Sequence, residues 1–306
     1  MKKSSLIKFL FGIFILIFLL YKIGFRDVLS KVISLNPVFY LIVFLILLVT
    51  LVIGAYNIKI LVNVENDKIP FKRIFYYNTL SWSIGLFVPG KIGEFSLVHL
   101  LKKEKISMGK ASVIFLLDKI ISLIVFLFFS MIGFIIFLDF SSILKLNIVI
   151  FILGLCFLFF VVFEKGRYLI KRYVLRKYAT EFEGFSDFLF LYFRKEKLLL
   201  LKNFILTFLK WFVNSFNVYI LLLAYNQNIS VFYVFLINAM LMIVSLIPIT
   251  ISGLGIGQSV AILLYKNLFN IEPSLVLSVY LIPLIIAYLI AVIIIISSLK
   301  KSNPYI

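Results

Sequence analysis

The sequence predicts an all-α polytopic membrane protein, with about six transmembrane helices and two re-entrant helical hairpins arranged as an inverted repeat. First, 63% of its 306 residues are hydrophobic and only 14% are charged, and the mean hydropathy is +1.16; soluble domains carry roughly 25% charged residues. Second, apolar stretches of about 20 residues, the length that crosses a bilayer, recur along the whole chain. Third, two more apolar stretches are interrupted by proline and glycine at matching places in the two halves.

Six stretches are uninterrupted and are expected to cross the membrane as helices. The first follows two lysines like a signal sequence, but no small-residue cleavage site comes after it, so we expect it to stay as a span. In chain order the six are Leu6–Ile23, Val38–Val62, Ala111–Leu138, Leu146–Phe163, Asn203–Ala224 and Ser274–Ser298.

Two further apolar stretches, Ile74–Leu101 and Val231–Phe269, contain residues that end helices. Bare backbone at membrane depth is tolerated only where it is buried in protein or lines a cavity, so these breaks are the first functional candidates. The interrupting residues are Pro89, Gly90 and Gly93 in the first stretch, and Pro248, Gly253, Gly255 and Gly257 in the second.

Lysine and arginine in the loops predict the orientation. Lysines near both ends place both termini in the cytoplasm, and residues 164–202 form a basic cytoplasmic linker. The loop Lys22–Pro37 is also basic but must lie outside. Each interrupted stretch then enters and leaves on one face, and residues 1–138 and 146–299 become two inverted halves of a single domain, 1–306. The alternative is that both interrupted stretches are kinked full spans.

The net charge of +18 predicts contact with the anionic cytoplasmic leaflet rather than with nucleic acid. Within the linker, Lys165–Tyr178 has the pattern of a basic amphipathic helix lying on that leaflet. The single cysteine, Cys156, excludes a disulfide within the chain, and the single histidine, His99, excludes a metal site built on histidine pairs. We find no cofactor motif and expect no metal, no cofactor and no enzymatic activity.

The first break carries charged residues beside its glycines: Lys91 can pair with a phosphate, and Glu94 can form an ion pair or cap a half-helix. The alternative places this loop among the headgroups, where charges cost little. Asp118 and Lys119 lie about two turns inside the span Ala111–Leu138. The sequence is compatible with two interpretations of Asp118, a structural salt bridge and a contact with substrate.

Other polar or aromatic residues in the spans have structural interpretations. Trp82 and Trp211 are expected to pack or to anchor at the interface. Asn214 and Asn217 share one helix face and are expected to bond to a neighbouring helix.

These motifs resemble the lysylphosphatidylglycerol synthase transmembrane-region, or flippase-like, family. The elements that carry the resemblance are Pro89-Gly90-Lys91-Ile92-Gly93-Glu94, the pair Asp118-Lys119, and Pro248 followed by Gly253-Leu254-Gly255-Ile256 and Gln258. Three departures stand out. Gln258 replaces the family's glutamate, Lys119 replaces its arginine and loses the bidentate fork, and a basic residue is missing near Ile282-Pro283.

The resemblance implies a stand-alone lipid flippase of the cytoplasmic membrane that lacks the soluble synthase domain. It would move a phospholipid or lipid-linked headgroup through a cleft between the hairpins, and membrane lipids, anionic phospholipids above all, would be its partners. One alternative is a non-transporting scaffold for a lipid- or glycan-modifying enzyme, acting through its basic linker. Another is an integral lipid-modifying enzyme, for which only Glu94, His99 and Asp118 are available as chemical groups.

Overall fold

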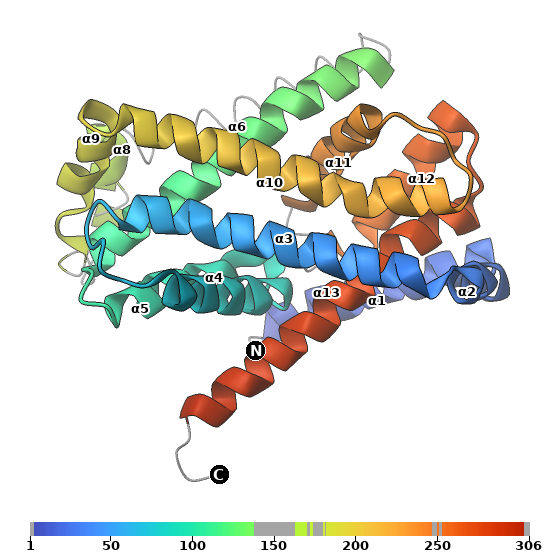
Figure 1. Cartoon of the computed structure of the whole chain (residues 1–306), viewed down its shortest axis with the longest axis horizontal. Helices are drawn as coiled ribbons and strands as arrows, with labels where there is room; N and C mark the ends of the chain where they lie inside the picture. Colours follow the sequence, from blue (N-terminus) through green and yellow to red (C-terminus); the bar gives the residue numbers. More distant parts are fainter. Residues whose placement is uncertain are drawn as a thin grey trace. The chain divides into compact units, whose positions relative to one another are not determined.

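The computed structural model describes residues 3–137, 163–169, 172–173, 180, 182–246, 250 and 253–302, and its regular elements there are helices. Figure 1 shows their order along the chain. The predicted span Leu146–Phe163 lies outside the described residues apart from its last residue. Cys156, Pro248 and half of the predicted amphipathic helix Lys165–Tyr178 lie outside them as well.

Four described helices are long and apolar enough to cross a membrane, and a bent pair of helices makes a fifth candidate. The four are α3 (Pro37–Val62), α6 (Met108–Phe137), α10 (Lys197–Ala224) and α13 (Pro273–Ser302); the bent pair is α1 (Lys3–Ile23) and α2 (Phe25–Ser34). The chain is therefore a multi-pass helical membrane protein, as its composition predicts.

Both interrupted stretches break where the sequence predicts. The first forms α4 (Phe71–Leu86), the tight helical turn η1 (Pro89–Phe95) and the short helix α5 (Ser96–Lys102). The second forms α11 (Val231–Leu246) and α12 (Ile256–Phe269). In each case a half-length helix is followed by a break, a second short helix and then a long apolar helix.

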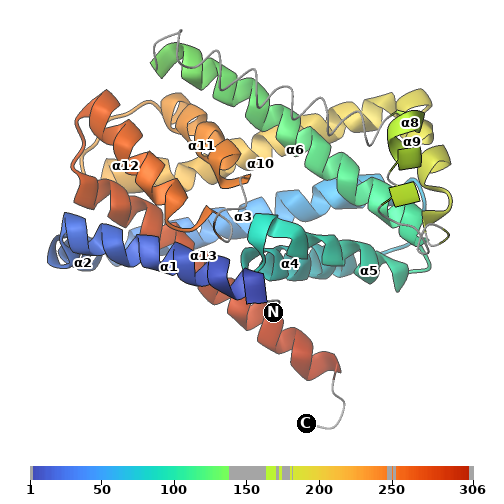
Figure 2. The same cartoon turned by 180° about the vertical axis from the view of Figure 1, so that it is seen from behind.

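The chain divides into two compact units, with boundaries inside α3, α4, η1 and α10. Unit 1 comprises residues 1–52, 78–94 and 210–306, and unit 2 comprises 53–77 and 95–209. In unit 1, α12 packs against α11, α13 and α1 (Figure 2). Both breaks, including residues 89–94 of η1, lie in this unit.

Unit 2 is built around α6, which packs against α5 and against α9 (Phe185–Arg194). Apolar side chains fill its core, among them Ile58, Leu101, Ile114 and Leu189, all at most 1% exposed. Two ion pairs tie its basic residues in place: Lys110 to Glu65 at 2.7 Å and Arg73 to Glu104 at 2.9 Å. The short helix α8 (Glu164–Leu169) begins the linker.

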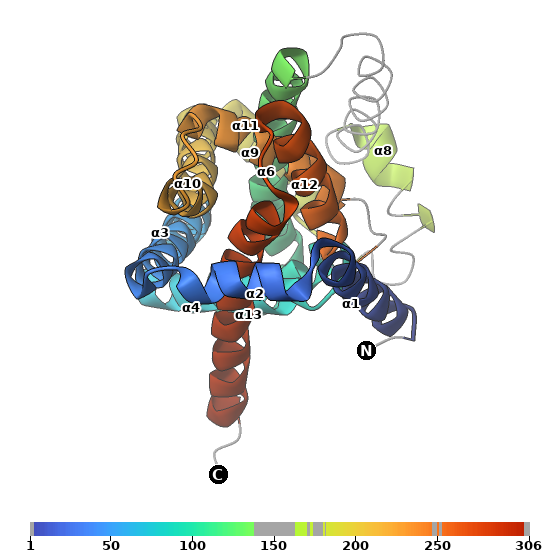
Figure 3. The same ribbon diagram turned by 90° about the vertical axis from the view of Figure 1, so that its right-hand side faces the viewer.

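The largest difference from the sequence prediction is α2, a helix within the stretch expected to be a loop. It is bent by 91° from α1, so that it runs across the end of that helix (Figure 3). Val28 is buried on it, while Phe25 and Ile33 are exposed. The charged residues of this segment made it resemble a loop, although its apolar residues follow an amphipathic pattern.

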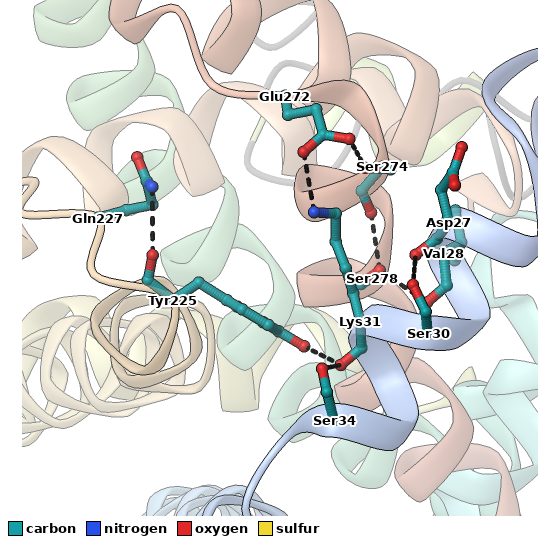
Figure 4. Close-up of polar contacts among 10 residues, drawn as sticks. All are labelled: Asp27, Val28, Ser30, Lys31, Ser34, Tyr225, Gln227, Glu272, Ser274 and Ser278. Carbon is teal, nitrogen blue, oxygen red and sulfur yellow. Dashed lines mark hydrogen bonds and ion pairs between the residues drawn. The ribbon is translucent and has the colours of Figure 1, made fainter.

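Polar contacts hold α2 to α13 and to the turn after α10 (Figure 4). Lys31 forms an ion pair with Glu272 at 2.8 Å, and Ser278 donates a hydrogen bond to the carbonyl of Val28 at 3.3 Å. The Tyr225 hydroxyl donates to the carbonyl of Lys31 at 2.6 Å. Burial raises the pKa of Tyr225 to about 12, so this hydroxyl stays protonated and remains a donor near neutral pH.

Acidic pH is expected to weaken this attachment. Hydrogen bonds from Lys31 and then from Ser274 lower the pKa of Glu272 below its usual range. Such a carboxylate stabilises the fold above the unfolded pKa of about 4.3, and this stabilisation is lost as the pH falls through the folded value. The melting temperature of the wild type in detergent should exceed that of Glu272→Gln at pH 7, with the gap closing below about pH 4. The difference in melting temperature is expected to be small because the Glu272 side chain is 59% exposed. A difference that does not change with pH would contradict a stabilising role of the Glu272 carboxylate.

Candidate functional site

The first break reverses the direction of the chain. Gly93 packs so closely on the end of α4 that a Cβ there would lie 2.7 Å from the carbonyl oxygen of Ile84. One residue further on, the side chain of Glu94 lies against Gly85, where a Cβ would meet the Glu94 Cγ at 2.5 Å. Only glycine permits both approaches, so Gly85 and Gly93 let η1 fold back onto α4. We call residues Pro89–Glu94 the first tip.

At this turn Lys91 has a backbone conformation that side chains other than glycine rarely adopt. Its φ is 56°, next to Gly90 at 62°. In the described part of the chain only Lys105, Asn226 and Asn270 share this property among residues other than glycine, and asparagine tolerates it well. The left-handed conformation costs about 1–2 kcal/mol for an ordinary residue. Lys91 therefore has a backbone conformation that glycine would adopt at lower cost, and strained residues of this kind cluster at functional sites.

The second break has the same construction, with Gly253 (φ 75°) packed against Ser245 at the end of α11. Gly255 directly precedes α12, and its N–H donates to the side-chain oxygen of Gln258 at 2.8 Å. Gln258, expected to contact substrate, therefore caps α12 and is itself buried. We call residues Gly253–Gln258 the second tip.

The second tip also lies against α1. A Cβ on Gly255 would meet the Ile15 Cβ at 2.7 Å and the carbonyl oxygen of Gly12 at 2.9 Å. The backbones of α1 and the second tip can approach this closely only because both Gly12 and Gly255 lack side chains.

Replacing Gly255 by alanine is therefore expected to destabilise the protein by about 3 kcal/mol, through its φ of 81° and the lack of space. Gly257→Ala is the matched control, because a Cβ there meets only the Ser245 hydroxyl at an ordinary 3.5 Å. It should change stability by less than about 1 kcal/mol. Thermal unfolding in detergent measures both; equal losses would contradict the contact with α1.

Both tips lie beside the middle of long apolar helices. The first tip places the Lys91 ammonium 5.9 Å from the ring centre of Trp211, which stands halfway along α10. The carbonyl of Leu86, just before this tip, accepts a hydrogen bond of 3.1 Å from Tyr288, halfway along α13. The second tip meets Gly12, close to the middle of α1. At 1.5 Å per residue, the middle of the 28-residue α10 is about 20 Å from either end.

Two residues beside the first tip were not predicted from the sequence to be part of the site. Trp211, expected to pack or to anchor at the interface, has the ammonium groups of both Lys91 and Lys210 over its ring, Lys210 at 5.2 Å. Lys210 interrupts the predicted span Asn203–Ala224, and a charge inside a span is the signal that could have revealed it.

Asp118 belongs to a separate polar cluster in unit 2. It is 3% exposed, and its Oδ1 accepts a hydrogen bond of 3.2 Å from the Asn57 amide. The same amide donates to Thr207 at 2.7 Å, and Asn203 donates to the carbonyl of Asn57 at 3.2 Å. Asn57, Asn203 and Thr207 are fully buried. These partners come from α3 and α10, so the cluster joins three apolar helices.

The remaining candidates have local contacts. Lys119 is 3.3 Å from Asp118 and partly exposed, and His99 is exposed with its ring edge-on to Phe95. The Asn217 amide donates to Asn214 at 3.3 Å. The hydrogen bond found for this pair is thus within α10 rather than to a neighbouring helix, because residues three apart on a helix face each other.

This arrangement offers charge and hydrogen bonds. Groups of three or more metal-ligating side chains are absent from the residues described. Lys91 of the first tip and Lys210 lie beside the middle of the long apolar helix α10. Such a set can bind an anionic group.

The chain matches the family model described as Lysylphosphatidylglycerol synthase TM region over residues 5–295. The match includes both tips and the Asp118 cluster. No curated protein matches the chain.

Proposed function

Because the chain belongs to the lysylphosphatidylglycerol synthase TM region family, we propose that it is a lipid flippase, which moves a phospholipid or lipid-linked headgroup between the leaflets of the cytoplasmic membrane. The single observation that carries the proposal is that both tips lie beside the middle of long apolar helices. Broken helices that bring backbone and charge to the middle of the bilayer mark the substrate sites of many transporters.

In the proposed mechanism both breaks are re-entrant hairpins of two inverted halves, within a bundle of six spans whose termini are cytoplasmic. The headgroup enters a cleft between the tips while its acyl chains stay in lipid. Lys91 pairs with the headgroup phosphate, and the positive end of the α12 dipole adds attraction. Anionic phospholipids are the proposed partners, and the protein binds and moves them without covalent chemistry.

Purified protein in vesicles containing a fluorescent phospholipid tests the proposal. Transfer should be faster than in protein-free vesicles, and it should fall when either tip is changed by substitution. Equal rates with and without the protein would reject it. The scaffold alternative makes the opposite prediction: substitutions at the tips are tolerated, whereas changes in residues 164–202 abolish function in cells.

A further inference from the structure

We propose that α2 lies flat in the outer surface of the membrane, as an interfacial helix with three faces. One face packs on the protein, one contacts lipid acyl chains, and one contacts lipid headgroups and water. The position in the interface follows from the helix and its neighbours and does not depend on lipid transport. The choice of the outer surface rests on the orientation given in the proposed function, in which both termini are cytoplasmic.

Helix α1 is long enough to span the membrane without α2. Its 21 residues measure about 30 Å, the thickness of the hydrocarbon core. Gly24 then turns the chain with a φ of 109°, a conformation that glycine adopts freely, and α2 leaves at 91° to α1 (Figure 3). Because α1 crosses the membrane, a helix at a right angle to it runs along the surface.

The ends of three other long apolar helices also meet α2. At the start of α3, the Tyr40 hydroxyl donates a hydrogen bond to the carbonyl of Val32. The end of α10 contributes Tyr225, and the start of α13 contributes Glu272 and Ser278 (Figure 4). Ends of helices that cross a bilayer lie at its two surfaces. Because the ends of α1, α3, α10 and α13 all meet at α2, this helix lies at one of those surfaces.

The exposed surface of α2 is divided between apolar and polar residues. Phe25, Leu29 and Ile33 fall within one sector of about 80° around the helix, and they are 57%, 41% and 72% exposed. The adjacent sector is also exposed, and it carries the polar residues Arg26, Asp27, Ser30 and Ser34. The remaining sector packs against the protein, where Val28 is buried. We call Phe25, Leu29 and Ile33 the apolar stripe of α2.

The boundary between lipid and water fits both exposed faces at once. In water, the apolar stripe would remain solvated, which is unfavourable for three large hydrophobic side chains. Inside the hydrocarbon core, Arg26 and Asp27 would lose their hydration, which is costly for charged groups. At the boundary, an amphipathic helix inserts its apolar face by about 5–10 Å and keeps its polar face among headgroups and water.

Tyrosines mark the same level of the molecule. Tyrosine is enriched where a membrane protein crosses the boundary between lipid and water. Tyr21 lies in the last turn of α1 and is 86% exposed. Tyr40 lies in the first turn of α3, and Tyr225 directly follows α10. Three helices thus place this residue type at the ends that meet α2.

The lysines of α13 assign α2 to the outer surface. Lys300 and Lys301 lie in the last turn of this helix, and basic residues that flank a span favour the cytoplasm. Helix α2 meets the opposite end of α13, so it lies outside. The ion pair between Lys31 and Glu272 reduces the basic charge of this segment, which eases its placement on that side.

Spin-label accessibility measures the depth of α2 in the full chain, reconstituted in phosphatidylcholine vesicles. Cys156→Ser removes the single cysteine, so that each further variant carries one nitroxide label. Labels at Leu29→Cys and Ile33→Cys should collide mainly with oxygen, which dissolves among acyl chains. Labels at Ser30→Cys and Ser34→Cys should collide mainly with a nickel chelate, which stays in water. The ratio of the two collision rates should differ several-fold between the two pairs.

Two control labels give the limits of this scale. Val49→Cys, exposed halfway along α3, reports the hydrocarbon core, and Lys68→Cys, exposed in the loop after α3, reports water. If the labels on the apolar stripe match Lys68→Cys, α2 lies in water and the proposal is wrong. If all four labels on α2 match Val49→Cys, the helix lies in the core and the proposal is equally wrong. Protection of the stripe from both reagents would show that protein, such as a second copy of the chain, covers it, and would overturn the proposal too.

A membrane-impermeant maleimide, applied to intact cells, tests the side of the membrane separately. It should react with Ser30→Cys in the Cys156→Ser background before the cells are lysed. Reaction only after lysis would overturn the outer position of α2 together with the orientation in the proposed function, while the collision rates still decide whether α2 lies in the interface. A failure of lipid transfer in vesicles would reject the transport proposal and leave both results for α2 unchanged.

Discussion

Lys91→Gly is expected to reduce lipid transfer at least tenfold while leaving the protein as stable as the wild type. The loss corresponds to about 1.5–3 kcal/mol for a hydrogen bond to a charged group. Stability is preserved because glycine adopts the φ of 56° without the cost that lysine bears, and this gain offsets the greater flexibility of glycine in the unfolded chain. Transfer in vesicles and thermal unfolding in detergent measure the two quantities.

Lys105→Gly is the matched control for this experiment. Lys105 also has a left-handed backbone, with a φ of 64°, but it lies in the turn between α5 and α6 in unit 2. The same substitution there relieves the same strain and removes the same charge. Transfer should be unchanged. If both variants lose transfer equally, the loss is caused by the lower net charge of the protein and not by a change at the first tip.

Asn57→Leu is expected to cost about 3 kcal/mol of stability, more than most single substitutions. Its amide donates to both Asp118 and Thr207 from a fully buried position. Removing it leaves the buried Asp118 carboxylate and the Thr207 hydroxyl each one donor short, and an unsatisfied buried group costs about 1–3 kcal/mol, more when it is charged. Unfolding in detergent, followed by heat or denaturant, measures the loss.

Two further variants identify the cause of that loss. Thr50→Val removes a buried hydroxyl from the same helix whose hydrogen bond is local, to the carbonyl of Leu47, so it should cost less than about 1 kcal/mol. The double variant Asn57→Leu with Asp118→Leu should be more stable than Asn57→Leu alone, because the buried charge is gone. A double variant less stable than either single one would show that packing, not charge, determines the stability.

Much of the helical framework could be predicted from the sequence, because apolar length is a strong signal in a membrane protein. Leu6–Ile23, Val38–Val62 and Ala111–Leu138 agree with α1, α3 and α6 to within three residues. Helix α10 begins six residues before the predicted span because Lys197–Lys202 continues the helix outside the apolar stretch. Helix α2 was missed, since a short amphipathic helix with charged residues resembles a loop.

The site could be predicted only in part. Proline and glycine marked both breaks, since their effect on the backbone is local. The partners of each break come from residues far away in the sequence, and no pattern pairs Lys91 with Trp211, or Gly255 with Gly12. Gln258 shows the same limit, because its side chain caps α12 through a hydrogen bond that only the folded turn creates.

The contact between Tyr288 and the carbonyl of Leu86 has a consequence for synthesis at the ribosome. The two residues are separated by about 200 positions, so at roughly 5–20 residues per second the first tip waits about 10–40 s for the helix that supports it. The second tip meets α1, which was made first. The early tip is thus the part of the nascent chain that most needs protection in the membrane, whereas the late one finds its support already in place.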